Sequence, residues 1–78
     1  MTIIEETVKK LLIRGILEEK PLPLSYSYSI ANNTIEYKVV AFNNVECLVN
    51  NSQSPSCRLS DLSVVDLVNL YCNGRNLG

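Results

Sequence analysis

The chain has 78 residues, with seven basic and eight acidic side chains, three cysteines and no histidine. A net charge of −1 gives no overall field that would attract nucleic acid or an anionic bilayer, so neither partner is implied. The length predicts one small domain over residues 1–78, with little room to enclose a small-molecule substrate.

Residues 2–19 are predicted to form a helix. Thr2 followed by Glu5 fits a capping box, in which each side chain satisfies a free amide of the first turn. Gly15 either ends the helix in a left-handed conformation or allows a neighbour to approach closely, so the helix ends within residues 14–19. Apolar residues recur at helical spacing and are expected to face the core, with charged residues off that face: Ile4, Val8, Leu11 and Leu12 against Glu5, Glu6, Lys9 and Lys10.

Residues 24–30 alternate between apolar or aromatic side chains and serines, which predicts a strand with one buried face. Asn32 and Asn33 predict a two-residue hairpin loop, followed by a second strand over residues 34–42. This loop length would place apolar or aromatic residues opposite one another across the hairpin. The expected pairs are Ile30 with Ile35, Tyr28 with Tyr37, Tyr26 with Val39, and Leu24 with Ala41.

Asn43 and Asn44 predict a second hairpin that returns through residues 45–49. A simple two-residue loop would place Glu46 opposite Ala41 on the apolar face, which is unfavourable. A bulge near the asparagines shifts the register by one residue and sends Glu46 outward. We therefore expect three residues of this strand on the core face: Val45, Cys47 and Val49.

A polar loop follows, and the last helix is expected to begin near Ser60 or Ser63 and to run to about Cys72. Gly74 is expected to end it in a left-handed conformation. The element order α-β-β-β-α predicts an α+β fold. In this fold a three-stranded antiparallel sheet, made of two hairpins, is flanked by N- and C-terminal helices.

The residues that usually carry catalysis or bind cofactors are missing. Histidine, the common base of nucleophilic triads, is absent, and the three glycines form no phosphate-binding loop. The cysteines lack the paired spacing of zinc sites. We therefore predict no enzymatic activity, no cofactor and no metal. Cys47 and Cys72 are expected in the core and Cys57 in a loop, and a Cys47–Cys57 disulfide is the alternative.

The sequence holds more apolar side chains than two helices and one sheet face readily cover. Either the helices cover both faces of the sheet, or an apolar patch remains for a partner. We therefore predict a small protein-binding module, such as a regulator, inhibitor or adaptor, whose partner is another protein or a second copy in a homodimer. The predicted partner-binding residues lie on the sheet and the last helix: Val40, Phe42, Leu48, Val64, Val68 and Tyr71.

A small DNA-binding transcriptional regulator is the alternative function. It would use Lys9, Lys10 and Arg14, together with Arg58 or Arg75, as phosphate contacts. No run of about 18 apolar residues is present and the N-terminus is acidic, so we expect a cytoplasmic protein without membrane contact. Short length and many asparagines are typical of accessory proteins carried by phages and other mobile elements.

Overall fold

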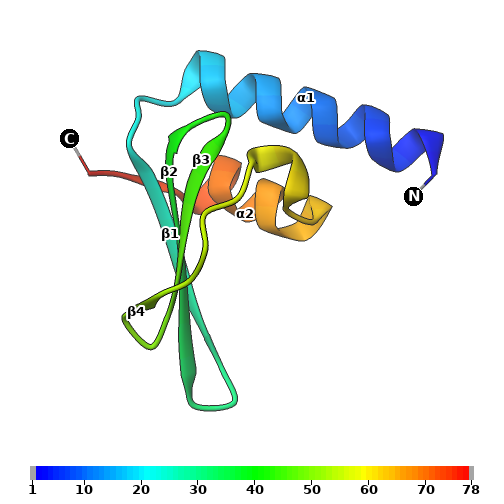
Figure 1. The fold of residues 1–78 in the computed structure, drawn as a ribbon. Coiled ribbons are helices and arrows are strands. Elements are labelled where there is room, and N and C mark those ends of the chain that lie inside the picture. Colours follow the sequence, from blue (N-terminus) through cyan, green and yellow to red (C-terminus); the bar gives the residue numbers. More distant parts are fainter. Residues whose placement is uncertain (1, 78) are drawn as a thin grey trace.

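The computed structural model describes residues 2–77, which form two α-helices, a short 3-10 helix and a five-stranded antiparallel sheet (Figure 1). It confirms the predicted α+β class and the order of helix, strands and helix. The two shortest strands and the 3-10 helix were not predicted. In chain order the elements are α1 Ile3–Glu19, β1 Leu24–Ile30, β2 Asn33–Ala41, β3 Asn44–Val49, β4 Ser52–Gln53, η1 Leu59–Asp61, α2 Val64–Asn73 and β5 Arg75–Asn76.

The helices lie on one side of the sheet, whose strand order is β4-β3-β2-β1-β5. Leu24, Val39 and Val45 are paired across neighbouring strands, so they share one face, and all three are buried. Helix α2 and η1 complete the core over this face, and α1 packs on α2 and η1. In Figure 1 the lower ends of the hairpins project beyond this helical layer.

The first hairpin turns one residue earlier than predicted. Ala31 and Asn32 form the two-residue loop, with φ of 49° and 66°, the left-handed values that such a turn requires. Asn33 instead pairs with Ile30, and its side-chain oxygen accepts a hydrogen bond of 3.0 Å from Asn50 Nδ2. The predicted pairs are therefore wrong by two residues. The observed ones are Tyr28 with Ile35, Tyr26 with Tyr37, and Leu24 with Val39.

The second hairpin confirms the bulged register. Val39 lies opposite Val45 and Ala41 opposite Asn44, so the ladder shifts at Val40 and not at the asparagines themselves. The shift places Val45, Cys47 and Val49 on the same face as the apolar residues of β2, as predicted. Only Val45 is fully buried there, and Val49 is 41% exposed. The shift also moves Phe42 out of the strand and into the turn.

The buried face of α1 differs from the predicted one. Of the four predicted core residues, Ile4, Val8 and Leu11 are exposed, and only the half-buried Leu12 packs against the core. Apart from Gly15, the buried residues are instead Lys9, Ile13 and Ile16. The last three also follow helical spacing, so two adjacent stripes compete for the core. The core takes the stripe that carries Ile13 and Ile16, and the Nζ of Lys9 donates a hydrogen bond of 3.0 Å to the Ser60 carbonyl. A partnered ammonium group can be tolerated at the core margin.

The predicted N-cap residues are confirmed, but the reciprocal half of the Thr2 capping box is not, because the Glu5 carboxylate accepts from the Thr2 hydroxyl in place of an amide. The cap predicted at the C-terminus of α2 is wrong. The hydroxyl oxygens of Thr2 and Ser63 accept hydrogen bonds from the amides of Glu5 and Asp66, at 3.1 and 3.2 Å. Gly74 has φ −65° and ψ 146°, so its backbone is extended and the predicted left-handed cap is wrong. A Cβ at this position would collide with the Leu70 carbonyl of α2 and with Leu24 of β1. Close packing, and not a left-handed turn, therefore accounts for the glycine.

Candidate functional site

An apolar stripe of α1 is open to solvent along the seam with α2. Ile4, Val8 and Leu11 are 76%, 36% and 64% exposed. Their spacing of i, i+4 and i+7 places them on one side of the helix. Gly15 is the next member of the same stripe, and a Cβ built on it would lie 2.7 Å from Tyr71 Cε2. The stripe therefore runs beside α2.

Helix α2 continues this surface across the seam. Val65 is 67% exposed and Val68 is 39% exposed, on the side of the helix opposite the buried Leu67 and Leu70. A shallow hollow between the helices is lined by side chains of α1 and by Val65, so this valine borders the seam. We refer to the exposed apolar residues beside the seam as the two-helix face: Ile4, Val8, Leu11, Val65 and Val68.

Tyr71 holds the two helices together at the end of the seam away from the chain's N-terminus. Its hydroxyl donates a hydrogen bond of 2.7 Å to Glu19 Oε1, and Lys20 Nζ lies 4.9 Å from its ring centroid. The Glu19 carboxylate, by accepting this hydrogen bond, raises the pKa of Tyr71 above its usual value. Tyr71 therefore supports the face from the side.

The six residues predicted to bind a partner do not form one surface. Val68 belongs to the two-helix face and Tyr71 contacts α1, while the half-buried Val64 lines the hollow between the helices. Leu48 is half-buried opposite Glu36 on the far face of the sheet. Val40 lies at the bulge, level with the start of β3, so about four residues, or on the order of 13 Å, separate it from Leu48.

Phe42 lies apart from both Val40 and Leu48. It is 44% exposed in the turn between β2 and β3. A hollow there is lined by Phe42 and by Ile13 and Leu17 of α1. Because Leu17 stands on the side of α1 away from the stripe, Phe42 does not belong to the two-helix face.

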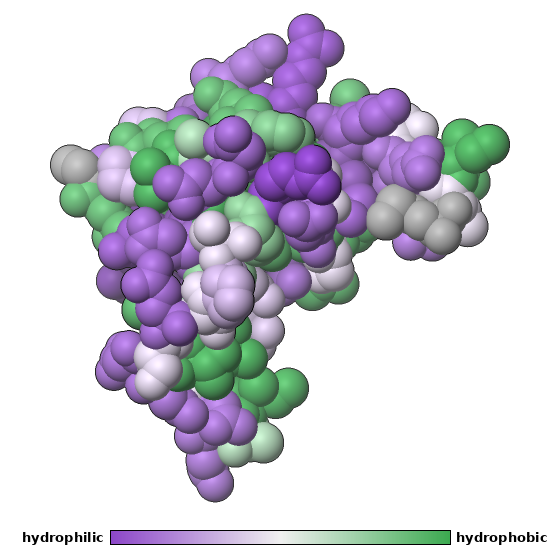
Figure 2. Space-filling view, in the orientation of Figure 1, coloured by the Kyte–Doolittle hydropathy of each residue, from purple (hydrophilic) through white to green (hydrophobic). Residues whose placement is uncertain are grey.

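A second apolar area lies on the projecting hairpins. Ile30 is 58% exposed and Val49 is 41% exposed, and the half-buried Ile35 lies opposite Val49. Figure 2 shows hydrophobic side chains gathered on this projecting part. The tyrosines pack together beside it, with ring centroids 5.7 Å apart for Tyr26 and Tyr28.

The basic residues of the DNA-binding alternative are dispersed. Lys9 is buried against Ser60, as described for α1. Arg14 forms an ion pair with Glu18 at 3.1 Å, and Arg58 lies 3.7 Å from a carboxylate oxygen of Asp61. These local acidic partners reduce the charge that α1 and the loop before η1 could present to a phosphate backbone.

The three thiols differ in exposure, and none forms a disulfide. Cys47 and Cys57 are half-buried with their Sγ atoms 3.7 Å apart, between β3 and the loop that pairs with it. Cys72 is exposed on α2, so its predicted core position is wrong. Burial, followed by the neighbouring Cys57 thiol, raises the pKa of the Cys47 thiol to about 11.

We expect iodoacetamide at pH 8 to alkylate Cys72 at least about tenfold faster than Cys47, because the thiolate is the reacting form. With a pKa of about 11, only about one Cys47 thiol in a thousand is ionised at that pH. Intact mass and peptide mapping over time measure both rates. The Cys47 rate should rise with pH until about 11. Equal rates in the folded protein would contradict the burial of this thiol.

Comparison with protein-family models, with curated proteins and with solved structures found no match. Neither helix of the described residues 2–77 is both long enough and apolar enough to cross a membrane. Among the same residues, no group of three or more Cys, Asp or Glu side chains is placed to hold a metal ion. The chain's own geometry therefore supplies all the support for a function.

Proposed function

We propose that the protein is a non-enzymatic protein-binding module that acts as a homodimer, with the two-helix face of one copy packed on that of a second. The observation that carries this proposal is the exposure of apolar side chains on two adjacent helices: Ile4, Val8, Leu11, Val65 and Val68. Large apolar areas on a small protein commonly mark an interface.

The direction of the helices suits such a dimer. Glu5 and Lys9 of α1 line a hollow with Val64, while Gly15 and the next turn contact Tyr71, so the helices run in the same direction. Figure 1 shows this arrangement. Two such pairs related by a two-fold axis form a four-helix layer, a common way to bury apolar helix faces.

Two charged side chains, Glu5 and Lys9, line the hollow that borders the face, and Lys9 already donates to the Ser60 carbonyl. The dimer must therefore leave the Glu5 carboxylate at its solvated rim. Full burial of a Val, Leu or Ile side chain contributes roughly 1.5–3 kcal/mol. Each copy contributes five such residues, one third to three quarters exposed, so the ten side chains together contribute on the order of 10 kcal/mol toward association. This sum is large enough to offset much of the entropic cost of forming the dimer.

Light scattering at micromolar concentration should give twice the 8.7 kDa mass of one chain. Leu11→Asp should weaken the dimer roughly 100-fold or more, because it places two carboxylates in the interface. Ile30→Asp is the matched control, since Ile30 is similarly exposed but lies on the hairpins, and it should keep the dimer mass. A monomeric wild-type protein, or a dimeric Leu11→Asp variant, would contradict the proposal.

No contact among the described residues favours the DNA-binding alternative. Of its basic residues within 2–77, only Lys10 and Arg75 are exposed and take no part in the ion pairs of the described residues. They lie on different elements, on α1 and β5.

A further inference from the structure

The two edges of the sheet are treated differently by the chain. Along β3 the following loop covers the edge: Val45 exchanges two backbone hydrogen bonds with Cys57, and the Ser54 amide donates to the Cys47 carbonyl at 2.8 Å. Along β1 the covering strand β5 pairs with only two residues, Leu24 and Ser25. The rest of the β1 edge has no neighbouring strand in the described chain.

The free edge of β1 offers the backbone groups of two serines. Ile30 pairs with Asn33 beside the two-residue turn, so Ile30 and every second residue before it bond to β2. Ser27 and Ser29 therefore turn their N–H and C=O groups to the other side. Consistent with this alternation, the Pro23 carbonyl accepts a bond of 2.9 Å from the Leu77 amide of the β5 segment. An added strand would find two donors and two acceptors there.

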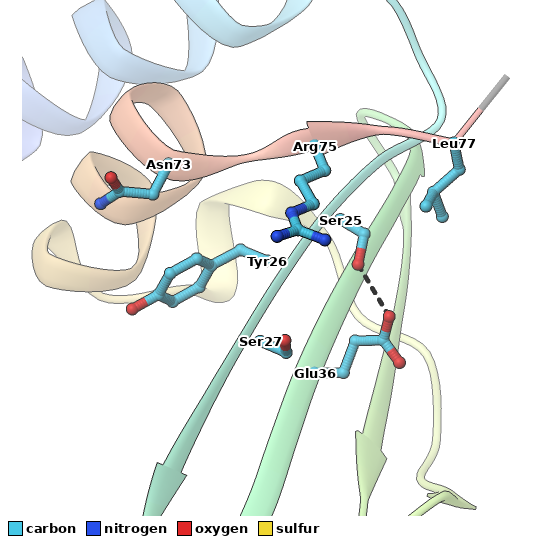
Figure 3. A pocket seen from close by; sticks show the side chains of 7 residues that line it. All are labelled: Ser25, Tyr26, Ser27, Glu36, Asn73, Arg75 and Leu77. Atoms are coloured by element: carbon cyan, nitrogen blue, oxygen red, sulfur yellow. Dashed lines mark hydrogen bonds between the residues drawn. The ribbon is translucent and has the colours of Figure 1, made fainter.

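One end of this free edge is closed and carries an arginine. A hollow of about 420 Å³ lies at the junction with β5, lined by Ser27 and Tyr26 of β1, Asn73 of α2, Arg75 of β5 and the carboxylate-bearing Glu36 of β2. Figure 3 shows the Arg75 guanidinium hanging from β5 into this hollow. Among residues 2–77 no carboxylate lies within ion-pair distance of Arg75. The nearby Glu36 accepts a hydrogen bond of 2.7 Å from Ser25 Oγ.

We propose that this edge binds the C-terminal end of an extended peptide, which adds a strand to β1 and places its carboxylate beside Arg75. A strand antiparallel to β1 runs in the direction of β5 and reaches the closed end last, with its C-terminus. Arg75 lies opposite Ser25, and Gly74 precedes it along the same edge, so the protein's own backbone blocks the edge at this point. A peptide that ends before Gly74 fits, and a peptide that continues past it does not. Arginine is well suited to a carboxylate.

A second copy of the chain fits this edge less well. If Ser27 paired with Ser29 of a second copy, Ala31 of that copy would come opposite Ser25. That position is already taken by Arg75. The obstruction favours a separate chain end over a dimer formed through β1, and it keeps this site independent of the two-helix face.

The alternation of β1 predicts which side chains the peptide carries. Gly74 lies level with Tyr26, so the last residue of the peptide lies level with Ser27, on the polar face that also carries Glu36. The second-last residue lies level with Tyr28 on the apolar face, and the third-last level with Ser29 on the polar face. We expect an apolar residue at the second-last position and polar residues at the last and third-last positions.

The test uses an acetylated pentapeptide, Thr-Val-Thr-Val-Thr, with a free carboxylate and, separately, with an amidated C-terminus. We expect the carboxylate form to bind at least about tenfold more tightly. Arg75→Ala should weaken the carboxylate form by a similar factor and remove the difference between the two forms. Arg58→Ala, a change at another exposed arginine, should leave both affinities unchanged.

Amide resonances locate the bound peptide. On titration the amides of Ser27 and Ser29 should shift and become slower to exchange with solvent. Ser27→Pro removes one donor on the free edge without breaking the ladder to β2, and it should weaken binding. Equal affinity of the two peptide forms, no saturable binding, or shifts confined to the two-helix face would overturn the proposal. Leu11→Asp changes the oligomeric mass without altering peptide affinity, so failure of the dimer is seen separately.

Discussion

Replacing Leu67 with alanine should lower the free energy of unfolding by about 2–5 kcal/mol. Leu67 is completely buried in the centre of the core, between α2 and the sheet, where Leu59 and Leu70 are equally buried. The loss combines the transfer energy of the removed atoms with the cavity that the rigid neighbours leave open. A 78-residue domain is stable by only about 4–12 kcal/mol, so the variant should be close to unfolding.

Urea denaturation followed by circular dichroism measures this loss. Val65→Ala is the matched control, because Val65 lies on the same helix and is 67% exposed. Its effect on the stability of a monomer should stay within about 0.5 kcal/mol. The comparison is made on the Leu11→Asp background, so that dimer formation does not add to either value. Similar losses for the two variants would mean that α2 does not turn Leu67 into the core.

The strands were well predicted because their side chains alternate with a period of two. Residues 24–30 are the first strand in both the prediction and the structure. The hairpin register was wrong by two residues, yet every side chain stayed on its predicted face, since an even shift preserves the alternation. The turn position depended on Ala31 adopting a left-handed conformation, which is uncommon for alanine and gives no sequence signal.

Helix α1 shows where periodicity alone is insufficient. Its sequence contains two adjacent stripes at helical spacing, and the wholly apolar one was predicted to be buried. The structure buries the other, which carries Ile13 and Ile16 into the core, and Lys9 is accommodated there by the Ser60 carbonyl, a tertiary contact 51 positions away in sequence. The apolar stripe of α1 was therefore identified from the sequence, but its exposure to solvent was not predicted.

The candidate sites depend on equally local irregularities. The bulge at Val40 and the turn at Phe42 separate residues that a regular strand would have placed together. The free edge of β1 exists because β5 is only two residues long, and such a short strand has no periodicity to detect. Its position follows from Gly74, the residue that brings the chain from α2 back to the sheet.

Gly74→Ala should therefore destabilise the protein by about 1–3 kcal/mol, although alanine is compatible with the backbone angles of this residue. The new Cβ would collide with the Leu70 carbonyl oxygen and lie 2.8 Å from Leu24 Cγ. Both obstacles belong to the buried core, where Leu24 is 2% exposed, so neither can move freely. The gain from a stiffer unfolded chain, about 0.4–1 kcal/mol, is too small to offset this.

Relief of the collision requires the chain after α2 to shift, which would displace Arg75 from its place beside Ser25. Gly74→Ala should thus lose both stability in urea and affinity for the free-carboxylate peptide. Gly15→Ala provides the comparison: its Cβ meets the ring of Tyr71, a side chain that can rotate, and alanine favours the helix by about 1 kcal/mol. We expect a smaller loss of stability there and unchanged peptide affinity. If Gly74→Ala retained wild-type stability, the close packing of α2 against Leu24 would be incorrect.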